Sequence, residues 1–167
     1  SIYEGNETAI VSISTVSGAD ATESGTQSVT ITVTENESTP VVTLATPATT
    51  IAENAGSSLT LTATLSVATT EDVTVALGAA GTGTEGTDYS TISDITVSAG
   101  QTTGTASFTP TDDSVYEGNE TGIVAISTVS GGSATEDGTQ SVTITITEDD
   151  SAPTVTLATL SLIHISE

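Results

Sequence analysis

The stretch Ser58-Leu-Thr-Leu-Thr-Ala-Thr-Leu65 alternates apolar and hydroxyl-bearing side chains without interruption. Successive side chains of an extended strand point to opposite faces, so the leucines and the alanine share one face and the threonines share the other. The same alternation recurs at 140–147, where threonines separate Ile144 from Ile146. Both stretches are therefore predicted to be half-buried β-strands.

Similar alternation predicts five more strands in the same part of the chain. The seven predicted strands are 41–45, 58–65, 72–77, 95–98, 104–109, 122–129 and 140–147. Turn sequences such as Gly131-Gly132 and Asp137-Gly138 separate them, and no stretch keeps helical spacing over ten residues. This pattern predicts an all-β fold, an antiparallel seven-stranded β-sandwich of the immunoglobulin-like type.

The composition restricts the partners. The 167 residues include 22 acidic side chains and no Lys or Arg, which gives a net charge of −22. Nucleic acids and anionic membrane surfaces would repel such a chain, and no apolar run is long enough for membrane insertion. The absence of cysteine excludes disulfides and thiolate metal sites.

The first residues of the chain return later at a constant offset. Residues 1–8 match residues 114–121, and residues 27–32 match residues 140–145, each 113 positions apart (114 − 1 = 140 − 27 = 113). Tandem repeats of 113 residues are the simplest explanation. The predicted domains are the C-terminal half of a repeat at 1–38, a complete repeat at 41–150, and the start of a next repeat at 152–159. They are followed by a tail at 160–167 whose sequence departs from the repeat. Because residue 1 falls inside a repeated motif, we expect the natural chain to begin earlier.

An acidic loop is the main candidate for chemistry. Asp112, Asp113, Glu117 and Glu120 lie within nine residues of a chain that has no basic side chain to neutralise them. A solvated acidic turn is the simpler interpretation, but Ca²⁺ readily accepts six to eight oxygen ligands from such a cluster. Further carboxylates stand beside predicted strands, at Glu53, Asp88 and 148–150. Antiparallel topology permits these loops to meet at one end, although it does not require it.

Five motifs in order resemble a Calx-β domain, the β-sandwich of sodium–calcium exchanger regulatory regions and of large bacterial surface proteins. They lie at 52–56, 83–89, 99–101, 112–120 and 143–150, and residues 1–37 resemble the second half. The resemblance implies Ca²⁺ at one end, with ligands Glu53, Asp88, Asp112, Asp113, Glu117, Glu120, Glu148, Asp149, Asp150 and the carbonyl of Val115. In the first copy the corresponding acidic residues are Glu4, Glu7, Glu35 and Glu37. There Asn36 replaces a carboxylate, which implies that the first copy binds fewer ions or binds them more weakly.

Enzyme activity is not expected. The single His lies in the departing tail, away from any Ser-His-Asp pattern, and the four aromatic residues cannot line a sugar cleft. Rows of Thr-x-Thr could form an ice-binding array, but outward threonine is also common on exposed strands.

Two function classes remain. The first is a structural Ca²⁺-binding repeat segment of a long secreted or cell-surface bacterial protein, acting as a stiffened spacer, fibre or matrix element. The alternative is an adhesin or a Ca²⁺-regulated binding module. Residues 1–38 supply only two strands, with a predicted apolar face of Ile10, Ile13, Val29 and Ile31. We therefore expect neighbouring repeats or identical subunits to be the partners.

Overall fold

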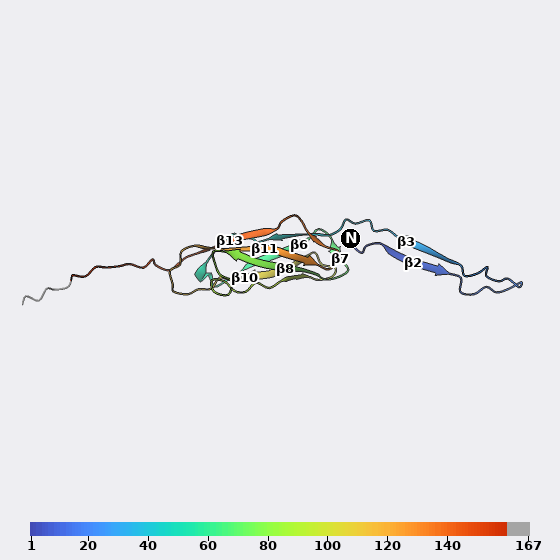
Figure 1. The fold of residues 1–167 in the computed structure, drawn as a ribbon, viewed down its shortest axis with the longest axis horizontal. Helices are drawn as coiled ribbons and strands as arrows, with labels where there is room; N and C mark the ends of the chain where they lie inside the picture. The colour runs from blue at the N-terminus through green and yellow to red at the C-terminus, as the bar shows by residue number, and fades with distance from the viewer. Residues whose placement is uncertain (160–167) are drawn as a thin grey trace, which may run out of the picture.

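The computed structural model describes residues 1–159, and the predicted tail at 160–167 lies outside the described residues. A β-sandwich occupies the middle of an elongated molecule (Figure 1). A hairpin extends from one end of this sandwich and the C-terminal segment extends from the other. Within residues 1–159, no helix is long and apolar enough to span a membrane.

The sandwich contains two sheets. The first has the spatial order β10 (Thr103–Phe108), β6 (Leu59–Leu65), β4 (Val41–Ala45), β12 (Thr135–Glu136). The second has the order β5 (Thr50–Ala52), β13 (Ser141–Thr147), β11 (Glu120–Ser130), β8 (Val73–Gly81), β9 (Ile95–Val97). A single 3₁₀ turn, η1 (Glu53–Ala55), follows β5.

The predicted β-sandwich is confirmed, and each of the seven predicted strands has a counterpart. Two short strands at the sheet edges, β5 and β12, were not predicted, and both run parallel to their neighbours. They are too short for an alternating pattern to be recognised. β8 continues to Gly81, beyond the predicted end at Leu77. Its last four residues are glycine and alanine, which show no alternating pattern, but they pair with β11 and so remain part of the sheet.

The core lies between the sheets and consists mainly of Val, Ile and Leu side chains. Its largest members, Tyr89 and Phe108, stack with ring centroids 4.7 Å apart at an interplanar angle of 25°. Gly122 lies against this pair, and a Cβ at that position would be 2.7 Å from the Phe108 ring. The bulky rings therefore require glycine at this point of β11.

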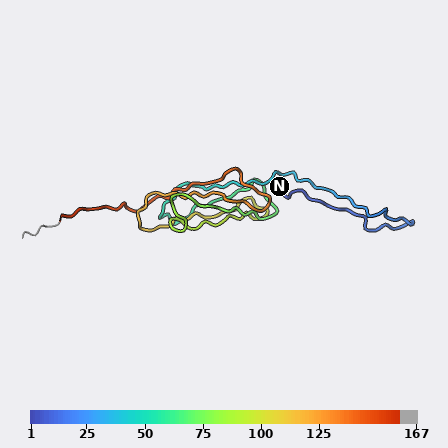
Figure 2. Tube along the Cα trace, viewed as in Figure 1, coloured from blue at the N-terminus to red at the C-terminus, as the bar shows by residue number. Residues whose placement is uncertain are grey.

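Residues 1–33 form a separate hairpin of β2 (Glu7–Ser12) and β3 (Ser28–Val33), drawn in blue at one end of the trace (Figure 2). Glu7 lies opposite Val33 in this hairpin, and Glu120 lies opposite Ile146 where β11 pairs with β13. The two registers are related by the same offset as the sequence (120 − 7 = 146 − 33 = 113). The repeated stretches therefore pair in the same way.

The hairpin is joined to the sandwich near its first residues. β1 (Ile2–Tyr3) pairs in parallel with β7 (Ala68–Thr69), a short strand of the complete domain. The remainder of the hairpin extends away from the sandwich, and every residue of β2 and β3 is exposed. The domain boundaries inferred from the repeat stay a prediction.

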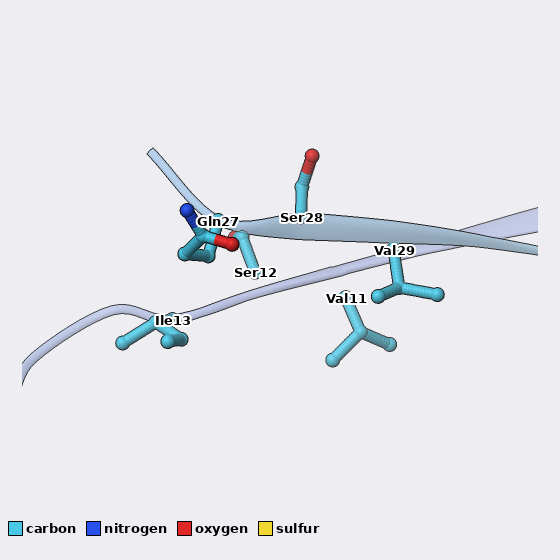
Figure 3. A pocket seen from close by; sticks show the side chains of 6 residues that line it. All are labelled: Val11, Ser12, Ile13, Gln27, Ser28 and Val29. Atoms are coloured by element: carbon cyan, nitrogen blue, oxygen red, sulfur yellow. The ribbon is translucent and has the colours of Figure 1, made fainter. Parts of the chain in front are cut away.

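One member of the predicted apolar face of the hairpin is wrong. The sequence predicts Ile10 on the same face as Ile13, Val29 and Ile31, but Ile10 lies opposite Thr30 while Val11 lies opposite Val29. Because side chains alternate along a strand, Val11 and Ile10 occupy opposite faces. Val11, Ile13 and Val29 are seen together on one side in Figure 3.

Candidate metal centre at one end of the sandwich

Two parallel strands bring the first carboxylates together. β5 runs parallel to β13, with Ala52 opposite Thr147 at their C-terminal ends. Parallel strands end at the same edge of a sheet, so the residues that follow them, Glu53 and Glu148, arrive side by side. Glu53 begins η1 and is only 9% exposed. The parallel pairing of β5 and β13 thus brings Glu53 and Glu148 together, which antiparallel topology alone did not require.

Glu120 and Asp88 reach the same end through the neighbouring strands. Glu120 begins β11, whose first residues pair with the last residues of β13. The Gly83 N–H donates to the Thr121 carbonyl at 3.0 Å, which holds the chain leaving β8 against the start of β11. The Asp88 carbonyl accepts the Thr111 N–H at 2.9 Å. The acidic loop therefore begins beside Asp88.

The carboxylates form two groups of three. In each group, one oxygen from every member lies within 4.8 Å of the other two: Glu53, Glu148 and Asp149 form the first, and Asp88, Glu117 and Glu120 form the second. Each group offers only hard oxygen donors, the type that Ca²⁺ prefers. No Lys or Arg exists in the chain to neutralise these charges.

The electrostatics reflect this crowding. Burial is the main cause that raises the pKa of Glu53 above the ordinary value of 4.5, and the negative charge of Glu148 adds to it, although the Asp113 N–H opposes the shift. Burial followed by repulsion from Asp88 likewise raises the pKa of Glu117 and of Glu120. Each of these carboxylates is therefore harder to ionise than an isolated glutamate, and a bound cation would relieve that cost.

Glu148 also holds the acidic loop in place. Its Oε2 accepts the backbone N–H groups of Glu117 at 2.6 Å and Gly118 at 2.8 Å, and its Oε1 accepts those of Asp149 at 3.0 Å and Asp150 at 2.8 Å. These bonds, led by the one from Asp150, lower the pKa of Glu148. The long arm of a glutamate allows this residue to reach the loop across 31 positions of sequence.

Asp150 supplies an oxygen without a partner. Its Oδ2 is buried and has no hydrogen-bond partner among the described residues. Burial, followed by the charges of Asp149 and Glu148, raises the pKa of Asp150. A buried, unpaired carboxylate oxygen is costly unless a cation or a proton satisfies it. The donor set at this end therefore fits a hard divalent cation such as Ca²⁺.

The other predicted ligands lie at the same end but outside the two groups. The Asp113 N–H donates to Glu53 Oε1 at 3.3 Å, and Asp113 Oδ1 accepts the Val115 N–H at 2.6 Å. Asp112 is exposed and adds to the negative charge around Asp150. The Val115 side chain is 59% exposed. The loop is thus tied to Glu53 by its backbone.

The first copy reproduces the loop anchor. Glu35 Oε2 accepts the backbone N–H groups of Glu4 at 2.6 Å and Gly5 at 2.7 Å, and Glu35 Oε1 accepts those of Asn36 and Glu37. These bonds, led by the one from Glu37, lower the pKa of Glu35 to about 2. Among residues 1–159, neither group of three includes a member of the first copy. Glu7 is exposed at the start of β2.

Sequence reasoning missed two asparagines at the site. Asn119 Oδ1 accepts the Glu148 N–H at 3.0 Å, and Asn6 makes the same bond to Glu35 at 2.8 Å in the first copy. Asn54 donates from Nδ2 to Asp149 at 2.5 Å. The recurrence of asparagine at positions 6 and 119 was the available signal for the first of these roles.

Comparisons with known proteins agree with the architecture. A family model described as the Calx-beta domain matches residues 35–150. The apo form of the Calx CBD1 domain is similar, with 18% identity, a TM-score of 0.54 and coverage of 66% of this chain and 99% of that one. CBD12 from CALX1.2 is also similar, with 19% identity, a TM-score of 0.55 and coverage of 65% and 45%. The comparison with curated proteins gives no match. The two structural similarities concern the fold.

Proposed function

Because the chain belongs to the Calx-beta domain family, we propose that it is a Ca²⁺-binding structural segment of a long secreted or cell-surface protein. Two clusters of three carboxylate residues lie at one end of the sandwich, beside the unpaired Oδ2 of Asp150. This arrangement, in a chain without Lys or Arg, is the observation that carries the proposal. Carboxylates held this close together with no Lys or Arg in the chain repel one another, and a bound divalent cation would neutralise them.

The two groups suggest two positions for Ca²⁺. Glu53, Glu148 and Asp149 would hold one ion, and the free oxygen of Asp150 would serve the same region. Asp88, Glu117 and Glu120 would hold the other. Glu148 would also keep the loop in a binding conformation, since its carboxylate bonds fix Glu117 and Gly118.

A stiffening role is supported by the place of the first-copy acidic residues. A hollow of about 110 Å³ at the junction of hairpin and sandwich is lined by Tyr3 and Glu4 on one side and Glu71 on the other. The β1–β7 pairing lies beside it. A cation bound between carboxylates of successive domains would oppose bending at this junction, whereas repulsion would favour bending in its absence.

Thermal unfolding of the whole chain with Ca²⁺ and with EDTA tests the proposal. An ion that binds only the folded state at a hundredfold excess over its Kd adds about 2.7 kcal/mol to the free energy of unfolding. We expect a higher melting temperature in Ca²⁺ for the natural sequence. We expect a much smaller increase for the variant Glu53→Gln with Glu120→Gln. Equal melting temperatures in Ca²⁺ and EDTA would contradict the proposal.

A further inference from the structure

The second carboxylate group draws its members from two different parts of the chain. Glu117 and Glu120 come from the acidic loop and the start of β11, and Glu148 holds that loop through the Glu117 N–H. Asp88 belongs to the connection between β8 and β9. Its carboxylate can join the group only if this connection is held at a fixed place against β11. The residues that hold the connection therefore set the geometry of the group.

Tyr89, next to Asp88, is the part of this connection that enters the core. The other residues of 84–91 are exposed or half-buried, whereas Tyr89 is only 1% exposed. Its ring stacks on Phe108 with the centroids 4.7 Å apart, and Phe108 is the fully buried last residue of β10. A large ring in a close-packed core is costly to move. It therefore fixes the backbone beside it, which includes Asp88.

Backbone pairing places the same segment beside the start of the acidic loop. Tyr89 pairs antiparallel with Pro110 in an isolated bridge. The Thr111 N–H donates to the Asp88 carbonyl at 2.9 Å. Pairing this short is marginal by itself, so it depends on the packing of the side chain at its centre. The ring thus secures Asp88 at the point where the two segments of the site meet.

The turn that contains Asp88 fixes the carboxylate to its own backbone. The Thr84 N–H donates to Asp88 Oδ2 at 2.5 Å, and the Asp88 N–H donates to the Thr84 carbonyl at 2.9 Å. The Gly86 N–H donates to the Tyr89 carbonyl at 2.7 Å. These bonds orient the carboxylate within the turn, and the buried ring of Tyr89 then places the turn as a whole.

The edge of the Tyr89 ring also lies near Glu120. A Cβ added at Gly83 would be 3.4 Å from Tyr89 Cε1 and 3.4 Å from Glu120 Oε2, so both atoms lie close to the same point. Burial is the main cause that raises the pKa of Tyr89, and nearby carboxylates, led by Glu85, add to it. The ring therefore stands next to the second carboxylate group on the side of the core.

We propose that Tyr89 is a positioning residue of the ion site, whose ring, stacked on Phe108, holds Asp88 within reach of Glu117 and Glu120. This inference deepens the proposed function, because it rests on Ca²⁺ binding at the second carboxylate group. Tyr89 supplies no ligand to the ion and acts through Asp88. The aromatic ring is the part of the side chain that does this, since the ring makes the packing contact with Phe108.

The first carboxylate group is positioned without Tyr89. Glu53 follows β5, and Glu148 and Asp149 follow β13, whose pairing with β5 brings the three together. Loss of the Tyr89 ring should therefore weaken one ion position and spare the other. This difference separates a positioning role from a general contribution of the ring to stability.

Titration calorimetry of the whole chain with Ca²⁺ tests the proposal. In Tyr89→Leu we expect the affinity at one ion position to fall by about tenfold to a hundredfold, the usual scale for residues that orient ligands, while the other position keeps its affinity. Tyr89→Phe retains the stacked ring and should restore the natural affinity.

Leu65→Ala is the control for lost packing. Leu65 is 2% exposed and ends β6, whereas Leu59 at the other end of β6 pairs with Phe108. Its truncation removes core contacts far from Tyr89. It should lower the melting temperature and leave the Ca²⁺ affinity unchanged.

A double-mutant cycle shows whether Tyr89 acts through Asp88. Asp88→Ala removes the carboxylate that the ring is proposed to position. In that background, Tyr89→Leu should cause little further loss of affinity, so the two effects should not add.

Amide hydrogen exchange in EDTA tests the positioning without any ion. The Thr84 N–H bonds to the Asp88 carboxylate and the Thr111 N–H bonds to the Asp88 carbonyl, so both amides report where Asp88 lies. We expect both to exchange at least about tenfold faster in Tyr89→Leu than in Leu65→Ala. If Tyr89→Leu does not fold, Phe108→Leu takes its place with the same expectations, because it removes only the stacking partner.

Four results would each overturn the proposal. They are unchanged affinity in the folded variant, an equal loss of affinity in Leu65→Ala, additive effects with Asp88→Ala, and unchanged exchange of the two amides. A natural chain that binds no Ca²⁺ would instead overturn the proposed function. The exchange measurement would still decide whether Tyr89 positions Asp88, so the two failures are distinguishable.

Discussion

The Glu148 carboxylate accepts the backbone N–H of Glu117 at 2.6 Å, so the residue after the last strand holds the loop before β11. Four backbone N–H groups in all share this one side chain. The loop contains Asp113 and Glu117, and its conformation therefore depends on Glu148, which lies 31 residues after Glu117 in the sequence. The same arrangement around Glu35 shows that it belongs to the repeated stretch and does not require the complete sandwich.

Shortening the Glu148 side chain should weaken Ca²⁺ binding. Glu148→Asp keeps the charge but withdraws the carboxylate from Glu117 and Gly118, so the loop loses its anchor. We expect at least about a tenfold loss of Ca²⁺ affinity by titration calorimetry, the usual scale for residues that orient ligands. Glu136→Asp, which shortens a glutamate outside the site, serves as the control. An unchanged affinity in Glu148→Asp would show that the loop is positioned by other contacts.

The stability of the Ca²⁺-free chain should depend on pH in two opposite ways. The folded-state pKa values of Glu53, Glu117 and Glu120 are raised above 4.5, so the folded state binds protons more tightly than the unfolded state. Their effect destabilises the fold as the pH rises from 4.5 through these raised values. Glu35, with a pKa of about 2, acts in the opposite sense, and its stabilisation is lost as the pH falls from 4.5 towards 2.

Melting temperatures in EDTA should therefore decrease from pH 5 to pH 7. With Ca²⁺ present the trend should reverse, because the ion binds the ionised carboxylates and its affinity rises as they lose their protons. Parallel pH profiles with and without Ca²⁺ would contradict the assignment of these carboxylates to an ion site.

Alternation in the sequence predicts the seven main strands, since strands such as β6 bury every second residue. It does not predict β5, which has three residues and owes its place to Ile51 and its pairing with β13. That short parallel strand determines where Glu53 lies, so the acidic residues could be identified from the sequence while their convergence could not. On the hairpin, Ile13, Val29 and Ile31 are predicted on the correct face, whereas Ile10 is misplaced because its neighbour Val11 is also apolar.

Two aspartates distinguish a specific site from bulk charge. Asp88 Oδ2 accepts the Thr84 N–H at 2.5 Å, and Asp94 Oδ1 accepts the Leu77 N–H at 3.1 Å. Asparagine can keep either bond, so Asp88→Asn and Asp94→Asn differ mainly in their distance from the acidic end. We expect Asp88→Asn to reduce Ca²⁺ affinity by at least about tenfold and Asp94→Asn to leave it nearly unchanged. Equal losses in calorimetric titrations would mean that only the total charge matters.

Gly122→Ala should destabilise the sandwich without touching the acidic end. The added methyl group would lie 2.7 Å from the Phe108 ring, which is fully buried and stacked on Tyr89. Forcing one carbon into a packed core costs about 1–3 kcal/mol, so denaturant unfolding should show a loss of that size.

Gly78→Ala is the matched control, because its Cβ would be 3.8 Å from the nearest heavy atom, an ordinary contact. Gly122→Ala combined with Phe108→Leu should recover part of the packing relative to the sum of the single changes. Stability of Gly122→Ala equal to that of Gly78→Ala would mean that Phe108 can move aside.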